Sequence, residues 1–259
     1  MRPVLSLCIA PHYWGRGASA PFTLHTVMPN LPAQHIPNSE IHLWHIPLDE
    51  CASRTAGGER ALTAEERARA DRFRFAADRA GWVQTRGIVR VLLGRYLGCA
   101  PAEVPLTVGA HGKPGLAPGF RGYPLHFNWS HTSNLALLAV TQSGPVGVDV
   151  ERVRADIDPL SLAQSVCSGR EMACLRDALP SQHSALFFGF WTGKEAVVKA
   201  HGAGLTLPPA RVCVAELARQ GTAHAHGFSV RALALGECHA AALAFGGKDP
   251  QICRCDWHG

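Results

Sequence analysis

The sequence predicts an α+β fold in which helices and short strands occupy separate stretches of the chain. Helical apolar periodicity covers about 64–97 and again about 158–202. Each helical stretch is followed by short segments with the period-two alternation of strands. The two halves therefore have the same order of elements, although no sequence repeat is visible. Helices followed by short antiparallel strands are typical of α+β proteins.

The first half contains one clear helix start, with Thr63 as the expected N-cap and Glu66 as the third helical residue of a capping box. We expect this helix to run to about Ala77 and an amphipathic helix to follow at Asp78–Leu97. Residues 1–38 are rich in Pro, His and Gly without periodicity and are expected to be an irregular extension. The other expected elements of this half are a strand at Ile41–Ile46, a loop-rich segment at 101–124 with a turn at 112–115, and strands at Leu125–Trp129 and Leu135–Thr141.

The second half opens with an expected strand at Val146–Glu151. Helical patterns follow over about 158–178 and 182–202, and Gly202 is the expected C-cap of the second helix. Three more strands are expected, at Val212–Leu217, Phe228–Leu235 and Ala240–Phe245.

The composition limits the function classes. With 259 residues, 47% of them hydrophobic, the chain can bury the core of one large domain or two small ones. The net charge of +5 suits an anionic ligand or an acidic protein partner, but it is too small to indicate nucleic-acid binding. No apolar run reaches the ~20 residues that span a bilayer, and the short run Val4–Ala10 is a poor match to a secretory signal. We therefore expect no membrane partner.

The nine cysteines are odd in number and scattered, which favours reduced thiols in the cytoplasm over a disulfide framework. Cys253 and Cys255 form a C-x-C pair near His258. Because a lone pair lacks the second pair of ligands that a structural zinc site needs, we do not expect one here. The roles of these three residues and of residues 1–38 stay open.

The strand at 147–151 carries two carboxylates on one face. Its apolar and acidic residues alternate, so Val148 and Val150 point inward while Asp149 and Glu151 share the opposite face. Two residues of rise along a strand separate those carboxylates by roughly 7 Å. Such a pair is often only a solvated strand edge.

The helix at 182–202 carries a second set of polar residues. Trp191, Glu195 and Lys199 are four residues apart and lie on one helix face. By default Glu195 and Lys199 are a surface ion pair and Trp191 is a core residue. If the strand and helix faces converge, however, three carboxylates and a lysine make a site for a hard cation beside an anionic substrate.

Taken together, the motifs resemble those of the Sfp-type 4′-phosphopantetheinyl transferases. The family has a G-[VI]-D-x-E strand followed by a [FW]-x-x-K-E-[AS]-x-x-K helix, and both are complete here. Upstream segments similar to the family's are an Arg-rich region from Glu65 to Arg90, Gly112-Lys113-Pro114, and Phe127-Asn128-Trp129-Ser130-His131. The resemblance covers about residues 40–245.

The resemblance implies a pseudo-duplicated α+β architecture with the active site in a cleft between the halves. The expected parts are an extension at 1–38, an N-terminal half at 39–143 and a C-terminal half with the transferase motifs at 144–250. It also implies transfer of 4′-phosphopantetheine from coenzyme A to a serine of an apo acyl or peptidyl carrier protein, with adenosine 3′,5′-bisphosphate as by-product. We expect a monomer in the cytoplasm.

The resemblance also assigns roles to site residues. Asp149, Glu151 and Glu195 match the ligands of Mg²⁺. Glu151, or a water that it orients, is the expected base for the serine proton, and Lys199 is expected to contact the transferring phosphate or the leaving oxygen. Lys194 is off that face and is expected to be a supporting or surface charge. Glu171 resembles a position linked to proton transfer, but Cys167 replaces the aromatic residue that usually precedes it, so Glu171 is a weak candidate.

Coenzyme A needs fixed positive charge for its 3′-phosphate. The residues expected to bind it are Arg69, Arg79, Lys113, Ser130, His131 and Lys199, with Arg67, Arg86 and Arg90 as further candidates. The alternatives from other classes are another Mg²⁺-dependent phosphoryl or nucleotidyl transferase and a non-catalytic module that binds coenzyme A or carrier proteins. The released product and the Mg²⁺ dependence separate these alternatives. The sequence does not name the carrier protein or its pathway.

Overall fold

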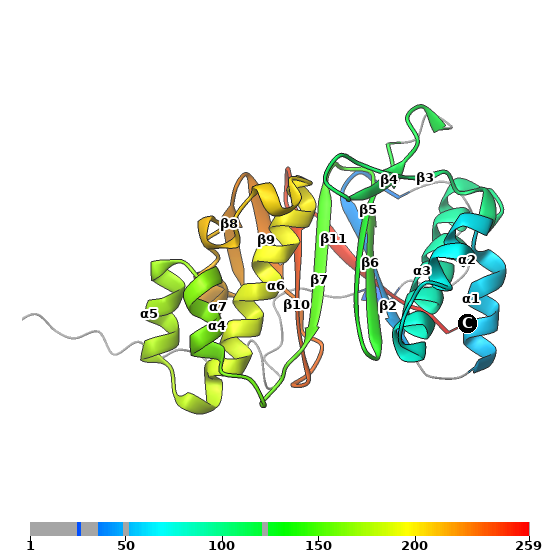
Figure 1. The fold of residues 1–259 in the computed structure, drawn as a ribbon. Helices are drawn as coiled ribbons and strands as arrows, with labels where there is room; N and C mark the ends of the chain where they lie inside the picture. Colours follow the sequence, from blue (N-terminus) through cyan, green and yellow to red (C-terminus); the bar gives the residue numbers. More distant parts are fainter. Residues whose placement is uncertain (1–24, 27–35, 49–51, 121–123, 259) are drawn as a thin grey trace, which may run out of the picture.

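The computed structural model describes residues 25–26, 36–48, 52–120 and 124–258. Most of the extension expected at 1–38 lies outside these residues. Figure 1 shows two β-sheets in the middle of the molecule with helices on their outer sides. The α+β class and the two-half architecture expected from the sequence are therefore confirmed.

The first sheet has five strands in the order β1-β11-β2-β6-β5. Its β2, β6 and β5 are antiparallel neighbours, whereas β11 pairs with β2 in parallel and β1 pairs with β11 in parallel. Helix α3 covers the outer face of this sheet, and a separate two-stranded sheet, β3-β4, lies beside it (Figure 1). The strands are β1 (His25–Thr26), β2 (Glu40–Pro47), β3 (Leu106–Val108), β4 (Pro114–Leu116), β5 (His126–Thr132), β6 (Leu135–Thr141) and β11 (Gln251–Asp256), and the helices are α1 (Ala52–Ala61), α2 (Ala64–Ala70) and α3 (Ala76–Leu97).

The second sheet has four antiparallel strands in the order β7-β10-β9-β8. Helix α6 lies along its outer face and is nearly all apolar on the side that it buries. Three shorter helices pack around α6 (Figure 1). The strands are β7 (Val146–Arg152), β8 (Thr222–Ala225), β9 (Phe228–Ala232) and β10 (His239–Phe245), and the helices are α4 (Pro159–Val166), α5 (Gly169–Asp177), α6 (His183–His201) and α7 (Leu217–Gln220).

The inner faces of the two sheets pack against each other. Side chains of β2 and β6 from the first sheet and of β7 and β10 from the second form one apolar cluster between them. Strand β6 is buried along its whole length because both of its faces are covered, which explains why it reads as a continuous apolar run. The alternation of β7 sends Val148 and Val150 into this cluster and leaves Asp149 and Glu151 on the side of α6.

The edge strands β5 and β7 lie side by side and join the halves. The side chain of Asn128 on β5 accepts a hydrogen bond from the Val148 amide of β7 at 2.9 Å. On its other side β7 lies very close to α6. A Cβ atom added at Gly147 would overlap the backbone of Ala196 and Ala200, so only glycine allows this approach.

Several sequence predictions are confirmed in detail. Thr63 caps α2 in a reciprocal capping box with Glu66. Gly202 ends α6 in a left-handed conformation, with φ of 78°. The strands expected around 41–46, 125–129, 135–141, 146–151 and 240–245 are all present.

Other elements differ from the prediction. The helix expected to reach Ala77 ends at Ala70, and the one expected over 158–178 is two helices, because Ser168 caps the second with its hydroxyl. The strand expected at 212–217 is wrong. The Val212 carbonyl accepts from Lys194 and the Val214 amide donates to Glu171, so side chains take the backbone groups that a neighbouring strand would use. The sequence patterns did not predict α1, β8 and β11, nor the short strands β1, within the expected irregular extension, and β3 and β4, within the expected loop-rich segment.

No helix within the described ranges combines the length and the apolar character that crossing a bilayer would require.

Candidate functional site

The candidate site lies where β5, β7 and α6 come together. Asp149 and Glu151 point from β7 toward α6, and Trp191, Glu195 and Lys199 share the facing side of that helix. Ser130 enters from β5 in the other half. The convergence of the strand face and the helix face therefore follows from their two periodicities, 2.0 and 3.6 residues.

Asp149 is the most buried carboxylate of the site, with 3% of the residue exposed. Its Oδ1 accepts from Lys199 Nζ at 2.5 Å and from the Ser130 hydroxyl at 2.7 Å, and Lys199 Nζ also lies 3.1 Å from Ser130 Oγ. Its Oδ2 is buried and has no hydrogen-bond partner in the described part of the chain. A buried carboxylate oxygen without a partner is costly and is open to a cation.

Glu151 and Glu195 flank this group. Burial, and then the negative charge of Asp149, raises the pKa of both side chains, while a hydrogen bond from Trp191 partly offsets the effect at Glu151. The single lysine does not balance three carboxylates, so the site has excess negative charge. The oxygens of the three carboxylates are not all within 4.8 Å of one another.

His131 follows Ser130 at the end of β5. Burial by the surrounding protein and then the charge of Lys199 lower the pKa of His131, although the residue keeps exposed surface. The imidazole is therefore biased toward its neutral form, in which it can still donate one hydrogen bond.

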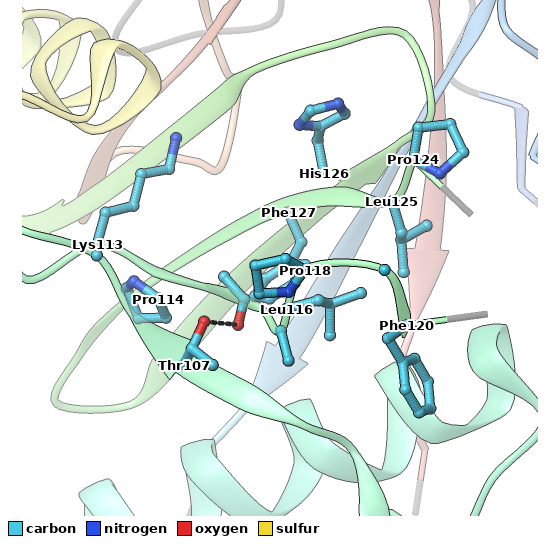
Figure 2. Close-up of a pocket in the computed structure, with 14 residues that line it drawn as sticks. Thr107, Lys113, Pro114, Leu116, Pro118, Phe120, Pro124, Leu125, His126 and Phe127 are labelled. Atoms are coloured by element: carbon cyan, nitrogen blue, oxygen red, sulfur yellow. Dashed lines mark hydrogen bonds between the residues drawn. The ribbon is translucent and has the colours of Figure 1, made fainter. Parts of the chain in front are cut away.

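Lys113 connects the first half to the second. Its Nζ donates to the carbonyls of Val146, at the start of β7, and Ala200, near the end of α6, at 3.2 and 3.1 Å. Burial lowers the pKa of this lysine. Figure 2 shows the side chain extending toward α6 from the rim of a cavity of about 690 Å³. Most of the labelled side chains that line this cavity are apolar, namely Pro114, Leu116, Pro118, Phe120, Pro124, Leu125 and Phe127.

The arginines expected to bind coenzyme A contact other residues of the first half. Arg79 pairs with Glu59 at 2.8 Å and Asp71 at 3.1 Å, and Arg69 lies over the ring of Trp82. The further candidates are also engaged. Arg86 and Arg90 each reach one oxygen of Glu66 at 2.5 Å, and Arg67 donates to the Leu62 carbonyl.

Lys194 is fully buried, so the expectation of a surface charge was wrong and that of a supporting charge is confirmed. Its Nζ lies 2.6 Å from Glu171 Oε2, and both side chains are 0% exposed. Lys194 also donates to the carbonyls of Pro209 and Val212, while Glu171 accepts from the amides of Ser168 and Val214. Glu171 thus holds α5, α6 and the 209–214 loop together.

One residue that positions the candidate site was not identified from the sequence. Asn128 fixes β5 against β7 and so sets where Ser130 meets Asp149. The signal was the F-N-x-S-H segment itself, in which Asn128 and Ser130 share one strand face.

Comparison with known proteins places this sequence in a family. The model of the 4′-phosphopantetheinyl transferase superfamily matches residues 145–242, and that of the 4′-phosphopantetheinyl transferase N-terminal region matches residues 53–143. The two matched segments adjoin at β7, where the site is built.

Relatives from three bacteria carry the same name. The chain is 40% identical over 181 residues to the 4′-phosphopantetheinyl transferase HetI of Nostoc sp. (strain PCC 7120), covering 70% of this chain and 76% of that protein. It is 39% identical over 124 residues to 4′-phosphopantetheinyl transferase AcpT of Salmonella typhimurium and 30% over 148 residues to the 4′-phosphopantetheinyl transferase of Bacillus subtilis. Those alignments cover 48% and 57% of this chain and 59% and 63% of the relatives. The chain belongs to the 4′-phosphopantetheinyl transferase superfamily and is an enzyme of the holo-carrier-protein synthase type.

Proposed function

We propose that this enzyme transfers 4′-phosphopantetheine from coenzyme A to a serine of an apo acyl or peptidyl carrier protein, with Mg²⁺ as cofactor. The family supplies the transfer reaction. The hydrogen bonding of Asp149 supports placing the reaction at this site. One of its oxygens accepts from both Lys199 and Ser130, and the other is buried and has no partner among the described residues.

In the proposed reaction the serine oxygen forms a bond to the β-phosphorus of coenzyme A. The bond from that phosphorus to the pyrophosphate bridge oxygen breaks, and adenosine 3′,5′-bisphosphate leaves with the bridge oxygen. The serine proton passes to a base. Negative charge grows on both phosphates, so the site must supply positive charge.

Asp149, Glu151 and Glu195 would hold the Mg²⁺. The unpartnered Asp149 Oδ2 and the raised pKa values of both glutamates mark a place that lacks positive charge. Mg²⁺ takes oxygen ligands and keeps several waters, which suits carboxylates spread more widely than a tight cluster. When bound, the cation would neutralise the charge that develops on the two phosphates.

Glu151 is the proposed base. It acts directly or through a water that it orients, and the hydrogen bond with Trp191 orients the carboxylate. Lys199 is proposed to contact the transferring phosphate or the leaving oxygen. Its Nζ uses two of three donors on Asp149 and Ser130, which leaves one for the substrate.

Coenzyme A is proposed to bind along β5 and the loop before it. The neutral His131 can donate to a phosphate oxygen, and Ser130 can do so when its one hydroxyl hydrogen turns from Asp149 Oδ1 to the phosphate. Lys113 uses two of its three donors on carbonyls and has one left for a phosphate. The apolar cavity beside Lys113 suits the flat adenine ring (Figure 2). Arg69 on α2 and Arg79 on α3 remain proposed contacts of coenzyme A.

A single copy of the chain can build this site, because Ser130 comes from the first half and Asp149 and Lys199 come from the second. We therefore propose an active monomer. The described chain includes free cysteines such as Cys167, Cys213 and Cys238, which suits the reducing cytoplasm, where coenzyme A and carrier proteins would be its partners.

The test is to incubate the enzyme with coenzyme A, Mg²⁺ and a panel of apo carrier proteins, and to weigh each carrier. A mass gain of one phosphopantetheine together with adenosine 3′,5′-bisphosphate supports the proposal. Replacing Asp149, Glu151 or Glu195 by alanine should lower turnover on the order of 10²-fold or more. Turnover unaffected by chelation, or a different product from coenzyme A, would reject it.

A further inference from the structure

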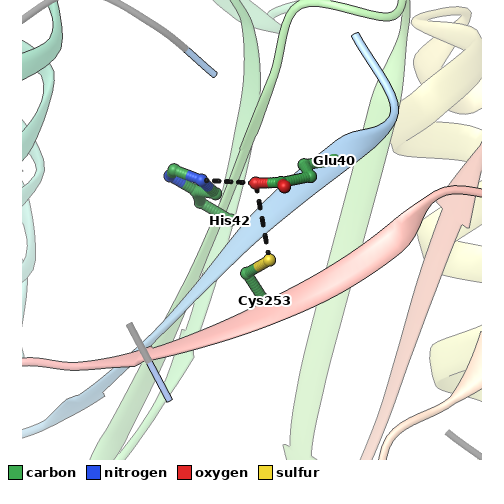
Figure 3. A group of neighbouring side chains, drawn as sticks. All are labelled: Glu40, His42 and Cys253. Carbon is green, nitrogen blue, oxygen red and sulfur yellow. Dashed lines mark hydrogen bonds and ion pairs between the residues drawn. The ribbon is translucent and has the colours of Figure 1, made fainter. Parts of the chain in front are cut away.

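A second polar cluster lies in the first sheet, far from the transferase motifs in the sequence. His42 on β2 and Cys253 on β11 are register partners in a parallel pair, and Glu40 precedes His42 by two residues. Side chains at these positions lie on one face of the sheet. Figure 3 shows His42 and Cys253 both directed at the carboxylate of Glu40.

The spacing of the three donor atoms fits a small metal ion. Glu40 Oε2 is 3.4 Å from His42 Nε2 and 3.6 Å from Cys253 Sγ, and the three atoms all lie within 4.8 Å of one another. Tetrahedral Zn²⁺, with bonds of about 2.0 Å to N and O and about 2.3 Å to S, separates its ligand atoms by about 3.3–3.6 Å. An ion at the centre therefore needs only small side-chain movements.

The surroundings orient the imidazole as a ligand. His42 is 2% exposed and Cys253 is 2% exposed, whereas Glu40 is partly open to solvent and gives a path for entry. The other ring nitrogen of His42 is 2.8 Å from the Tyr96 hydroxyl, and the indole N–H of Trp44 donates to the same hydroxyl. Metal-binding histidines usually have such a partner on the second nitrogen, because it fixes the ring and its tautomer.

We propose that Glu40, His42 and Cys253 bind one Zn²⁺, with a water as fourth ligand. A thiolate and an imidazole favour zinc over Mg²⁺ and Ca²⁺, which take oxygen ligands. Binding releases the thiol proton, and the thiolate and carboxylate then balance the charge of the ion. This site is separate from the carboxylate site on β7. It ties β11, which follows the second half, to β2 of the first.

The test uses the full chain after chelation and dialysis, with Zn²⁺ and Co²⁺ as probes. Bound zinc is measured by elemental analysis, and Co²⁺ reports a thiolate ligand through a near-ultraviolet charge-transfer band. Cys253→Ser should remove the band and weaken zinc binding at least about tenfold. Glu40→Gln should also weaken zinc binding about tenfold but keep the thiolate band at saturating Co²⁺, and its partly exposed position keeps the fold intact. The matched control is Cys255→Ser, a buried thiol two residues along β11 that should change neither readout.

Three further measurements complete the test. Glu195→Gln should keep the band, and excess Mg²⁺ should not remove it, because the carboxylate site is a different one. Thermal melts in chelator show whether each variant is folded. Absence of a stoichiometric thiolate band in the wild type, or a band that persists in Cys253→Ser, would overturn the proposal.

Discussion

Lys199 Nζ lies 2.5 Å from Asp149 Oδ1, the same oxygen that accepts from the Ser130 hydroxyl. The lysine belongs to α6, the aspartate to β7 and the serine to β5, so one oxygen joins three elements from both halves. Among the described residues, Asp149 Oδ2 has no hydrogen-bond partner and can take another ligand. Lys199 thus both holds the aspartate and lies next to the place where a phosphate would react.

Replacing Lys199 by alanine should lower turnover on the order of 10²-fold or more, because a main source of positive charge is removed. Lys199→Arg should also lose most activity, since the planar fork of arginine does not fit between Ser130 and Asp149 as a point charge does. Steady-state transfer to a carrier protein measures both. The matched control is Lys248→Ala at an exposed loop, and equal losses in it would show a nonspecific charge effect.

Replacing Lys194 by methionine should act on stability first. It leaves the Glu171 carboxylate buried without its partner, which costs about 3–5 kcal/mol. The double variant Lys194→Met with Glu171→Gln should recover part of this loss, because it removes the buried charge, whereas the single amide oxygen can accept from only one of the two backbone amides, Ser168 or Val214, that Glu171 accepts with separate oxygens. Denaturant unfolding measures the free energies. A single variant as stable as wild type would contradict the buried pair.

The local sequence patterns of this chain predict the residues of the candidate site better than they predict the residues that hold those side chains in place. The period-two alternation of β7 and the i, i+4 spacing on α6 place Asp149, Glu195 and Lys199 correctly, because each pattern fixes a face within one element. A pattern does not state which segment covers that face. The site could therefore be assembled only with the motif order of a known family.

The features that were missed at the two polar sites depend on pairing between distant segments. Lys194 appears as a supporting charge in the sequence, and only the fold brings Glu171 and the Val212 carbonyl to it. Likewise, Cys253 looks like half of an incomplete C-x-C site because its neighbours come from β2, more than 200 residues earlier. Parallel pairing of a late strand with an early one leaves no local signal.

The Gly147→Ala variant should lose both stability and activity without removing any functional group. The added methyl overlaps the backbone of Ala196 and Ala200 and must push β7 away from α6, which separates Asp149 from Lys199. Gly81→Ala is the matched control, since a Cβ in that part of α3 meets no atom within 4 Å and should be neutral or slightly stabilising. Thermal melts and turnover test both. Normal turnover in Gly147→Ala would mean that the close approach is unimportant.

Association with the carrier protein should depend on salt. The chain has a net charge of +5, and exposed arginines crowd the end of α2 and the turn after it, including Arg67, Arg69, Arg72 and Arg74. An acidic partner is attracted by such a field, and salt screens the attraction. The carrier KM should rise with ionic strength while kcat changes little. A KM that stays flat under saturating coenzyme A and Mg²⁺ would exclude electrostatic docking.

Mg²⁺ affinity should fall as the solution is acidified, beginning above the ordinary glutamate pKa of 4.5. The pKa values of Glu151 and Glu195 are raised by burial and by Asp149, so protons compete with the cation at a higher pH than they would at exposed carboxylates. Calorimetric titration with Mg²⁺ at a series of pH values measures the effect. An affinity that is constant down to pH 4.5 would contradict it.

The same raised pKa of Glu195 makes a second prediction for the metal-free protein. A carboxyl whose pKa is higher in the folded than in the unfolded state destabilises the fold once it is ionised, and this loss disappears below the unfolded pKa. In chelator at neutral pH, Glu195→Gln should therefore melt at a higher temperature than the wild type, and the difference should shrink toward pH 4.5. With Mg²⁺ the order should reverse, because only the wild type keeps all three ligands. A variant that is less stable than the wild type in chelator at neutral pH would show that Glu195 is satisfied without a cation.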